Sequence, residues 1–382
     1  MKIQYFDGYF IEMDPVQVVL QFLKEEGYKE SFEALKREAE VEYKENDLRP
    51  HVLRQNLGEM NITDQTSALR RILNGPKITS AVEESKTSFN GSPVAMLTIH
   101  ENNEKYVLTS FTDGSVKKID AAGKEIASVN HKISTLLCFE QQNNLVYFGT
   151  MSGSIGSLKL SDLSIHNQTN LPPGSIVGIT IVGKYLFAAS RGNHFIILNT
   201  DDLDSPVAIF TYPNPVTALC KVKDGVIYSV QNDSMFHFRK SDDVLNEVLF
   251  HMNPNSFDIG AMDIRYLEPC PADESIFVAL TDRCSAYLYR YPKDSKQLEV
   301  MKVLTHFVSD GLTQPQLLWT FGPTLISTSD DQTVIGVEIE SNMVSFKLTG
   351  WKKATRCVAI INKKLLVGAF DKSITVFNIE LV

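Results

Sequence analysis

The apolar side chains between Val18 and Glu38 recur at spacings of three and four residues, which places them on one stripe of a helix. A break at Gly27-Tyr28 divides this stretch into two short runs. Asp14-Pro15 is a helix start signal, because Asp suits the N-cap and proline suits the first helical position. Gly27 can end the first run in a left-handed conformation. The pattern predicts two short helices in a tight hairpin over residues 14–41.

Helices of about three turns are marginal in water by themselves, so the apolar stripe of this hairpin needs a partner. A second copy of the hairpin would supply one by forming a four-helix bundle around a two-fold axis. The open alternative is that the hairpin packs on its own domain. The residues expected in the dimer contact are Val19, Leu20, Phe22, Leu23, Gly27, Tyr28, Phe32 and Leu35.

The residues on either side of the hairpin are less regular. Residues 1–13 mix aromatic and polar side chains and stay unassigned. The stretch 42–77 is interpreted as a helical connector, with helices expected over Leu48–Leu57 and from Thr63 to Leu73. Asn74-Gly75-Pro76 stops the second of these and marks a domain boundary.

From Ala81 onward the period changes to short apolar or alternating runs separated by Gly, Asn, Asp and Pro. The first unit contains four such runs, and Asp113-Gly114 between its second and third runs is a strong hairpin signal. The same order recurs at about 40 residues, which is the repeat length of a propeller blade. The second runs of the later units begin at Leu145, Tyr185, Val226, Ser275, Thr324 and Lys364.

The last unit, which begins near Ala354, ends before a fourth strand, whereas residues 81–89 form a strand with no neighbour of its own. Pairing these two segments would close a ring and remove an open sheet edge. Six full units and the shared one predict a mainly β fold, a seven-bladed β-propeller over residues 78–382 that is preceded by the α-helical hairpin.

The hairpin resembles the LisH motif. The resemblance is carried by Leu20, Phe22-Leu23, Gly27-Tyr28, Ser31, Phe32, Leu35 and Glu38. LisH motifs are homodimerisation devices, so the resemblance implies a dimer or higher oligomer.

The repeats resemble the WD-repeat family in a degenerate form. Asp113 to Asp120 looks like the turn, third strand and terminal dipeptide of that family, with Ile119 where Trp is common. Asp371 to Asn378 fits in a similar way, and Asp331-Gln332-Thr333-Val334 is a weaker case. No Trp-Asp pair closes a unit. A kelch-type propeller would carry double glycines in each unit, which are missing here.

Composition narrows the class of partner. A net charge of −9 argues against a dedicated nucleic-acid binder, so no nucleic acid is expected. The five cysteines are scattered without a Cys-x-x-Cys pair, which is typical of an intracellular protein in the cytoplasm or nucleus. We expect no direct membrane insertion, because no apolar run is long enough to span a bilayer.

The chemistry of known catalytic motifs is not found. Gly178 to Lys184 matches the start of a phosphate-binding loop, but Tyr185 follows where Ser or Thr would hold magnesium. The eight histidines include no pair at helical ligand spacing. We predict no catalytic residues, no metal site, no cofactor and no small-molecule substrate. An active site assembled across blades is the open alternative.

The architecture resembles LisH–WD-repeat proteins, which include a dynein regulator, corepressor subunits, a splicing factor and ubiquitin-ligase subunits. The resemblance implies a non-catalytic, homo-oligomeric scaffold that binds other proteins through its propeller. The alternative is a substrate receptor or structural subunit of a multi-subunit E3 ubiquitin ligase, although 42–77 is short for a complete CTLH-type segment.

The partner surface is expected where the turns between second and third strands and the links between blades lie free of sheet constraints. Trp351 stands out because exposed Trp beside basic residues is typical of an interface hot spot, although its ring could instead pack against a blade edge. The residues expected on this surface are Lys132, Arg191, Arg283, Trp351, Lys353 and Lys372.

Overall fold

The chain forms two compact units, Met1–Gln65 and Thr66–Val382. The structure is a computed structural model, and the residues that it describes are 2–4, 10–12, 15–25, 28–43, 70, 73–102, 104–252, 262–291, 298–307 and 315–382.

The first unit contains a small strand pair and two helices. Strands β1 (Lys2–Gln4) and β2 (Phe10–Glu12) pair antiparallel, and helices α1 (Pro15–Glu25) and α2 (Lys29–Ala39) occupy the stretch where the sequence predicts a hairpin. The amide of Tyr28 donates to the carbonyl of Leu23 at 2.8 Å, a bond over five residues that is typical of a helix end. The helices predicted over Leu48–Leu57 and from Thr63 lie mostly outside the described residues.

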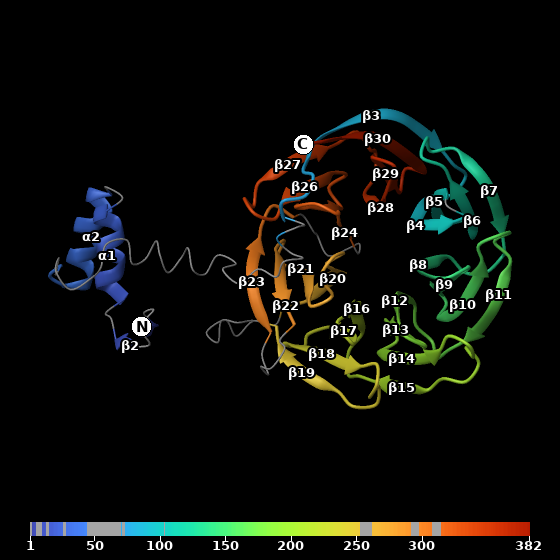
Figure 1. Ribbon diagram of the computed structural model, residues 1–382, viewed down its shortest axis with the longest axis horizontal. Helices are drawn as coiled ribbons and strands as arrows, with labels where there is room; N and C mark the ends of the chain where they lie inside the picture. The colour runs from blue at the N-terminus through green and yellow to red at the C-terminus, as the bar shows by residue number, and fades with distance from the viewer. Residues whose placement is uncertain are drawn as a thin grey trace. The chain divides into compact units, whose positions relative to one another are not determined.

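The second unit contains seven four-stranded antiparallel sheets, which Figure 1 shows as blades around a central axis. In six of the blades the strands follow chain order from the centre to the rim. The inner strands are β4 (Pro93–Glu101), β8 (Leu136–Gln142), β12 (Ile176–Val182), β16 (Val216–Val222), β20 (Ile264–Pro269), β24 (Leu317–Trp319) and β28 (Thr355–Ile361). The second strands are β5 (Glu104–Phe111), β9 (Leu145–Thr150), β13 (Tyr185–Ser190), β17 (Gly225–Val230), β21 (Ile276–Thr281), β25 (Thr324–Thr328) and β29 (Lys364–Ala369).

The third strands pair with the second strands, and the outer strands form the rim. The third strands are β6 (Ser115–Ile119), β10 (Ser154–Lys159), β14 (His194–Asn199), β18 (Met235–Lys240), β22 (Ala286–Arg290), β26 (Val334–Glu338) and β30 (Ser373–Leu381). The outer strands are β7 (Glu125–Asn130), β11 (Ile165–Asn170), β15 (Ala208–Thr211), β19 (Val248–His251), β23 (Glu299–Leu304), β27 (Val344–Leu348) and β3 (Ile78–Ser88).

The last blade is built from both ends of the propeller sequence. Strand β3 pairs antiparallel with β30, with Ile78 opposite Leu381 and Ser88 opposite Ser373. Lys77 and Val382 exchange backbone hydrogen bonds of 2.9 and 3.0 Å just beyond the strands. The strand that has no neighbour in the sequence pattern thus supplies the fourth strand that the last unit lacks.

Position in the blade explains the composition of the strands. Second strands such as β9 and β13 are buried along nearly their whole length because sheets cover both of their faces, and they read as apolar runs. The outer strand β7 alternates between exposed and half-buried residues, because only one of its faces packs on the neighbouring blade.

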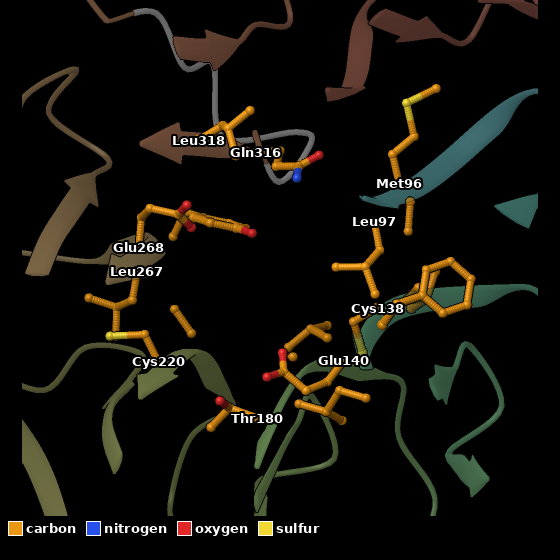
Figure 2. A pocket seen from close by; sticks show the side chains of 18 of the residues that line it. Met96, Leu97, Cys138, Glu140, Thr180, Cys220, Leu267, Glu268, Gln316 and Leu318 are labelled. Carbon is orange, nitrogen blue, oxygen red and sulfur yellow. The ribbon is translucent and has the colours of Figure 1, made fainter. Parts of the chain in front are cut away.

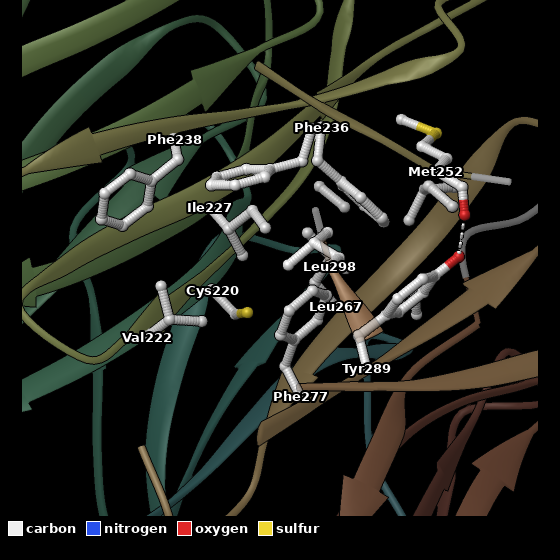
Figure 3. Close-up of a cluster of buried hydrophobic side chains, with 14 of the residues drawn as sticks. Cys220, Val222, Ile227, Phe236, Phe238, Met252, Leu267, Phe277, Tyr289 and Leu298 are labelled. Carbon is white, nitrogen blue, oxygen red and sulfur yellow. Dashed lines mark hydrogen bonds between the residues drawn. The ribbon is translucent and has the colours of Figure 1, made fainter. Parts of the chain in front are cut away.

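The hydrophobic core consists of layers between consecutive blades. Figure 3 shows the layer between the blades of β16–β19 and β20–β23, where Phe236 meets the rings of Phe277 and Tyr289 edge-on. The hydroxyl of Tyr289 donates to the carbonyl of Met252 at 2.6 Å, so its polar end is paired inside this layer.

Candidate functional site

One face of the propeller gathers the turns between second and third strands together with the links between blades. In each blade the last residue of the second strand or the one after it donates its amide to a carbonyl of the preceding link, at distances between 2.9 and 3.0 Å. We call this the link face. Its donor and acceptor pairs are Thr112 and Ser92, Met151 and Thr135, Arg191 and Ser175, Gln231 and Pro215, Asp282 and Asp263, Thr328 and Gln316, and Phe370 and Ala354.

The aspartates that carry the WD-repeat resemblance shape turns on this face. Asp113 accepts hydrogen bonds from the amide and hydroxyl of Ser115 at 3.0 and 2.6 Å. Asp331 accepts the same pair of bonds from Thr333, and Asp371 accepts them from Ser373. A carboxylate that bonds the backbone two residues ahead closes a turn locally, so these aspartates have a structural role.

Five of the six residues predicted on the partner surface are exposed on the link face. Lys132 and Lys353 lie in links between blades, whereas the other three lie in turns between second and third strands. Arg191 lies within electrostatic reach of Arg356, which lines the channel at the start of β28. The three turn residues are Arg191, Arg283 and Lys372.

The sixth residue, Trp351, is not an exposed hot spot, and that interpretation of it is wrong. Its side chain is 5% exposed, and its indole N–H donates to the hydroxyl of Thr375 at 3.1 Å. The ring packs against Phe377, with 5.8 Å between ring centroids, and fills the layer between the last two blades. The large apolar ring gains more from burial in this layer than from a position on the surface.

The inner strands enclose a central channel with a cavity of about 430 Å³. All seven blades contribute to its wall, which combines aliphatic side chains with polar and charged ones. Figure 2 shows that Glu140 from β8 and Glu268 from β20 point into the open centre of this channel. Burial raises the pKa of Glu140 to about 7 and that of Glu268 to about 8.

The two glutamates occupy equivalent positions, because six of the inner strands carry the same irregularity. Each of these strands has a register shift near its start that leaves one residue unpaired. The third residue after the unpaired one then lies at the same level of the channel in each strand. These residues are Leu97, Glu140, Thr180, Cys220, Glu268 and Ala359, and all of them line the cavity.

Neither glutamate is among the site residues predicted from the sequence. The sequence does contain a signal for them, because each is a charged residue in an inner strand that otherwise reads as half-buried. Its meaning depends on knowing which residues share a level of the ring.

The predicted dimer residues are distributed unevenly in the first unit. Val19 and Tyr28 are exposed, whereas Leu23, Phe32 and Leu35 are half-buried. Leu20 is fully buried within one copy. The side chain of Phe22 and all of Gly27 lie outside what the structure describes.

The described part of the chain contains neither a membrane-spanning helix nor a metal centre. None of the described helices is both long and apolar enough to cross a membrane. Among the same residues, no group of three or more His, Cys, Asp or Glu side chains could hold a metal ion.

Comparison with known proteins identifies the fold. No protein-family model and no curated protein matches the chain. Among solved structures, it is similar to the crystal structure of the WD40 β-propeller domain of Doa1, with a TM-score of 0.57 and 13% identity. That match covers 79% of this chain and 96% of the other. The second unit is therefore a seven-bladed β-propeller whose fold is similar to that of a WD40 domain. At this identity the likeness speaks for the fold alone.

Proposed function

We propose that the protein is a non-catalytic, homo-oligomeric scaffold that binds partner proteins through the link face of its propeller. Residues 14–41 would join two or more copies as a LisH-type hairpin, and each copy would contribute one propeller. Two linked propellers would bind a multivalent partner more tightly than one, because the second contact forms at a raised effective concentration. The free thiols of all five cysteines suit a reducing compartment, which we take to be the cytoplasm or nucleus.

The proposal of an oligomer rests on the exposure of helix α2. It has a marked apolar stripe, yet none of its described residues is buried. A half-exposed stripe of this kind can gain free energy by packing against a second copy. Leu23 and Leu35 are the best probes of this contact, because both are half-buried in a single copy. Leu20 is a poor probe, since a change there would also disturb the fold of its own unit.

The test is the mass of the intact chain in solution. Leu23→Lys and Leu35→Lys should each convert the oligomer into a monomer, because a charge in a buried apolar contact is costly. Glu33→Gln is the matched control, since it changes the charge by the same amount at an exposed position of α2 and should leave the mass unchanged. A monomeric wild-type chain in light scattering would remove the oligomer from the proposal.

The link face is supported by the exposure of its basic residues in a chain of net negative charge. Arg191→Glu with Lys372→Glu should reduce the recovery of partners in an affinity pull-down read by mass spectrometry. The control is Lys105→Glu with Lys184→Glu, which makes the same charge change near the hairpins between inner and second strands. This control should leave the recovery of partners unchanged. Equal losses in both double variants would place the partner surface elsewhere. Recovery of ligase subunits by the wild type would favour the E3 ubiquitin ligase alternative.

A further inference from the structure

At the level of the channel defined by the six equivalent inner-strand residues, two side chains are acidic and none is basic. Glu140 and Glu268 hold equivalent positions in the second and fifth blades, so they face the channel from opposite sides of the ring. The other members of this level are Leu97, Thr180, Cys220 and Ala359, none of which carries a charge. Figure 2 shows both carboxylates directed toward the open centre.

The carboxylates lack a cation at contact distance within the described part of the chain. Glu268 accepts one hydrogen bond, from the amide of Trp319 at 3.2 Å, and Glu140 accepts none there. Lys221 is the cation whose field lowers the pKa of Glu140, but its ammonium lies 3.1 Å from a carboxylate oxygen of Glu274.

Two cations, Lys221 and Arg356, also line the channel, although neither is within ion-pair distance of the two acids. The titratable groups that face them in the channel are Tyr266, Cys138, Cys220, Lys221 and Arg356. Burial is the main cause that raises the pKa of both glutamates, and the charge of Glu140 raises that of Glu268 further, so both retain protons at a pH where exposed acids are ionised. A cation that entered the channel would remove this penalty.

The side chains of the channel wall favour an organic ammonium over a metal ion or a guanidinium. Aliphatic side chains such as Leu97, Leu219 and Leu318 surround the two acids, which suits a ligand with a methylene chain behind its charge. A divalent metal would need more oxygen ligands than two side chains supply. One oxygen of Glu268 already accepts the amide of Trp319, which works against the paired contact that a guanidinium forms. A compact ammonium with three donors can instead bond single oxygens.

We propose that the channel binds an alkylammonium group, with its NH₃⁺ at Glu140 or Glu268 and its methylene chain along the aliphatic wall. Such a group is presented by a free aliphatic diamine or by the lysine side chain of a protein segment. The site goes beyond the proposed scaffold role and does not depend on it.

The test is binding to the full chain in a buffer free of primary amines. The probes are 1,5-diaminopentane and Nα-acetyl-lysine amide, with 1,5-pentanediol as the uncharged control, and the readout is isothermal titration calorimetry. At least one amine should bind while the diol does not. Its affinity should rise about tenfold from pH 6 to pH 8.5, because the glutamates ionise in this range while the amine stays protonated.

The double variant Glu140→Gln with Glu268→Gln should lose at least tenfold in amine affinity, because it keeps the shape of the wall and removes both charges. Glu83→Gln with Glu104→Gln is the matched control, since it removes two exposed acids and should bind as the wild type does. Binding by the diamine alone would assign a small-molecule site, and binding by the lysine derivative would assign a site for a partner's side chain.

The proposal is overturned if neither amine binds, if the diol binds equally well, or if the channel double variant retains full affinity. Should that variant fail to fold, the wild type alone decides, because an affinity that does not rise from pH 6 to pH 8.5 contradicts the proposal. None of these results bears on the mass of the oligomer or on the pull-down, so the scaffold role is judged separately.

Discussion

Acidic side chains respond to burial in opposite ways in two parts of the propeller. In the channel, burial raises the pKa of Glu140 and Glu268 because no described cation contacts them. Between the third and fourth blades, Glu247 is also partly buried, but hydrogen bonds from His237, Tyr212 and Tyr228 lower its pKa to about 2. The hydrogen-bond partners account for the lowered pKa of Glu247, which is also less deeply buried than the two channel glutamates.

The raised pKa values of the channel glutamates make stability depend on pH. Their folded pKa values, about 7 and about 8, exceed the ordinary value of 4.5, so the folded state holds more protons between these limits. The free energy of unfolding should therefore fall as the pH rises from 4.5 to 8. Glu140→Gln with Glu268→Gln should be more stable than the wild type at pH 9 by about 2 kcal/mol, and by less at pH 6. Urea denaturation at both pH values, in a buffer free of amines, would contradict this if the two curves shifted equally.

Arg239 is the central cation of a buried polar cluster. It is 3% exposed and donates to Glu247 at 2.9 Å, to the hydroxyl of Tyr228 at 2.9 Å and to the carbonyl of Leu245 at 2.8 Å. Its guanidinium also stacks over the ring of Phe210, at 3.6 Å from the centroid. These contacts tie β15, β17 and β18 to the segment before β19.

Removal of this cation should be strongly destabilising. Arg239→Met should lower the free energy of unfolding by about 3 kcal/mol, because it leaves Glu247 partly buried without its cation. Lys364→Met is the control: it removes a cation 2.7 Å from Glu84 in a more exposed ion pair, and should cost less than about 1 kcal/mol. If both variants lost a similar free energy of unfolding in urea denaturation, the cluster would contribute no more to stability than a surface ion pair does.

At the scale of elements, strand β3 closes the ring of blades by pairing with β30. Ile78 is buried in the layer between the last two blades, and Lys86 and Glu84 form ion pairs with Asp371 and Lys364. The strand therefore contributes a hydrogen-bond ladder, apolar burial and charge pairing to the last blade. A chain without it would present an unpaired edge along β30.

Two truncations separate the role of β3 from that of the residues before it. Removal of residues 1–76 leaves the strand intact and should leave a folded propeller. Removal of residues 1–92 should lower the melting temperature by more than about 5 °C or cause aggregation, because the ladder to β30 is lost. Calorimetry and size-exclusion chromatography would refute the closure role if both fragments melted together.

At the scale of the molecule, we expect the two units to have different functions. The propeller has its own core layers and a closed ring, so it does not need the first unit for its architecture. The first unit has a half-exposed helix and is too small to bury a large core alone. Self-association is therefore expected from the first unit and partner binding from the second.

This division predicts the masses of two species. The intact chain should show at least twice the 42.8 kDa of one copy, and the fragment 66–382 should be a monomer. Light scattering at matched molar concentration measures both. An oligomeric fragment would move the contact between copies to the propeller.

The order of the strands could be predicted from the sequence because its signals are local. Alternation, short apolar runs and Asp-containing turns act within ten residues, and the second strands begin at Leu145, Tyr185, Thr324 and Lys364 as the pattern predicts. The closing strand also followed, because a unit that lacks one strand and a strand that lacks a unit leave one simple solution.

Only the tertiary structure decided where single side chains lie between blades. Trp351 is in a link, where no alternation tells its direction, and packing against Phe377 and Thr375 determines its burial. Glu140 and Glu268 are far apart in the chain and come to one level because their strands share a register shift within a ring. Such convergence depends on the closure of the whole propeller, which no local pattern records, whereas the strands themselves depend only on their neighbours in sequence.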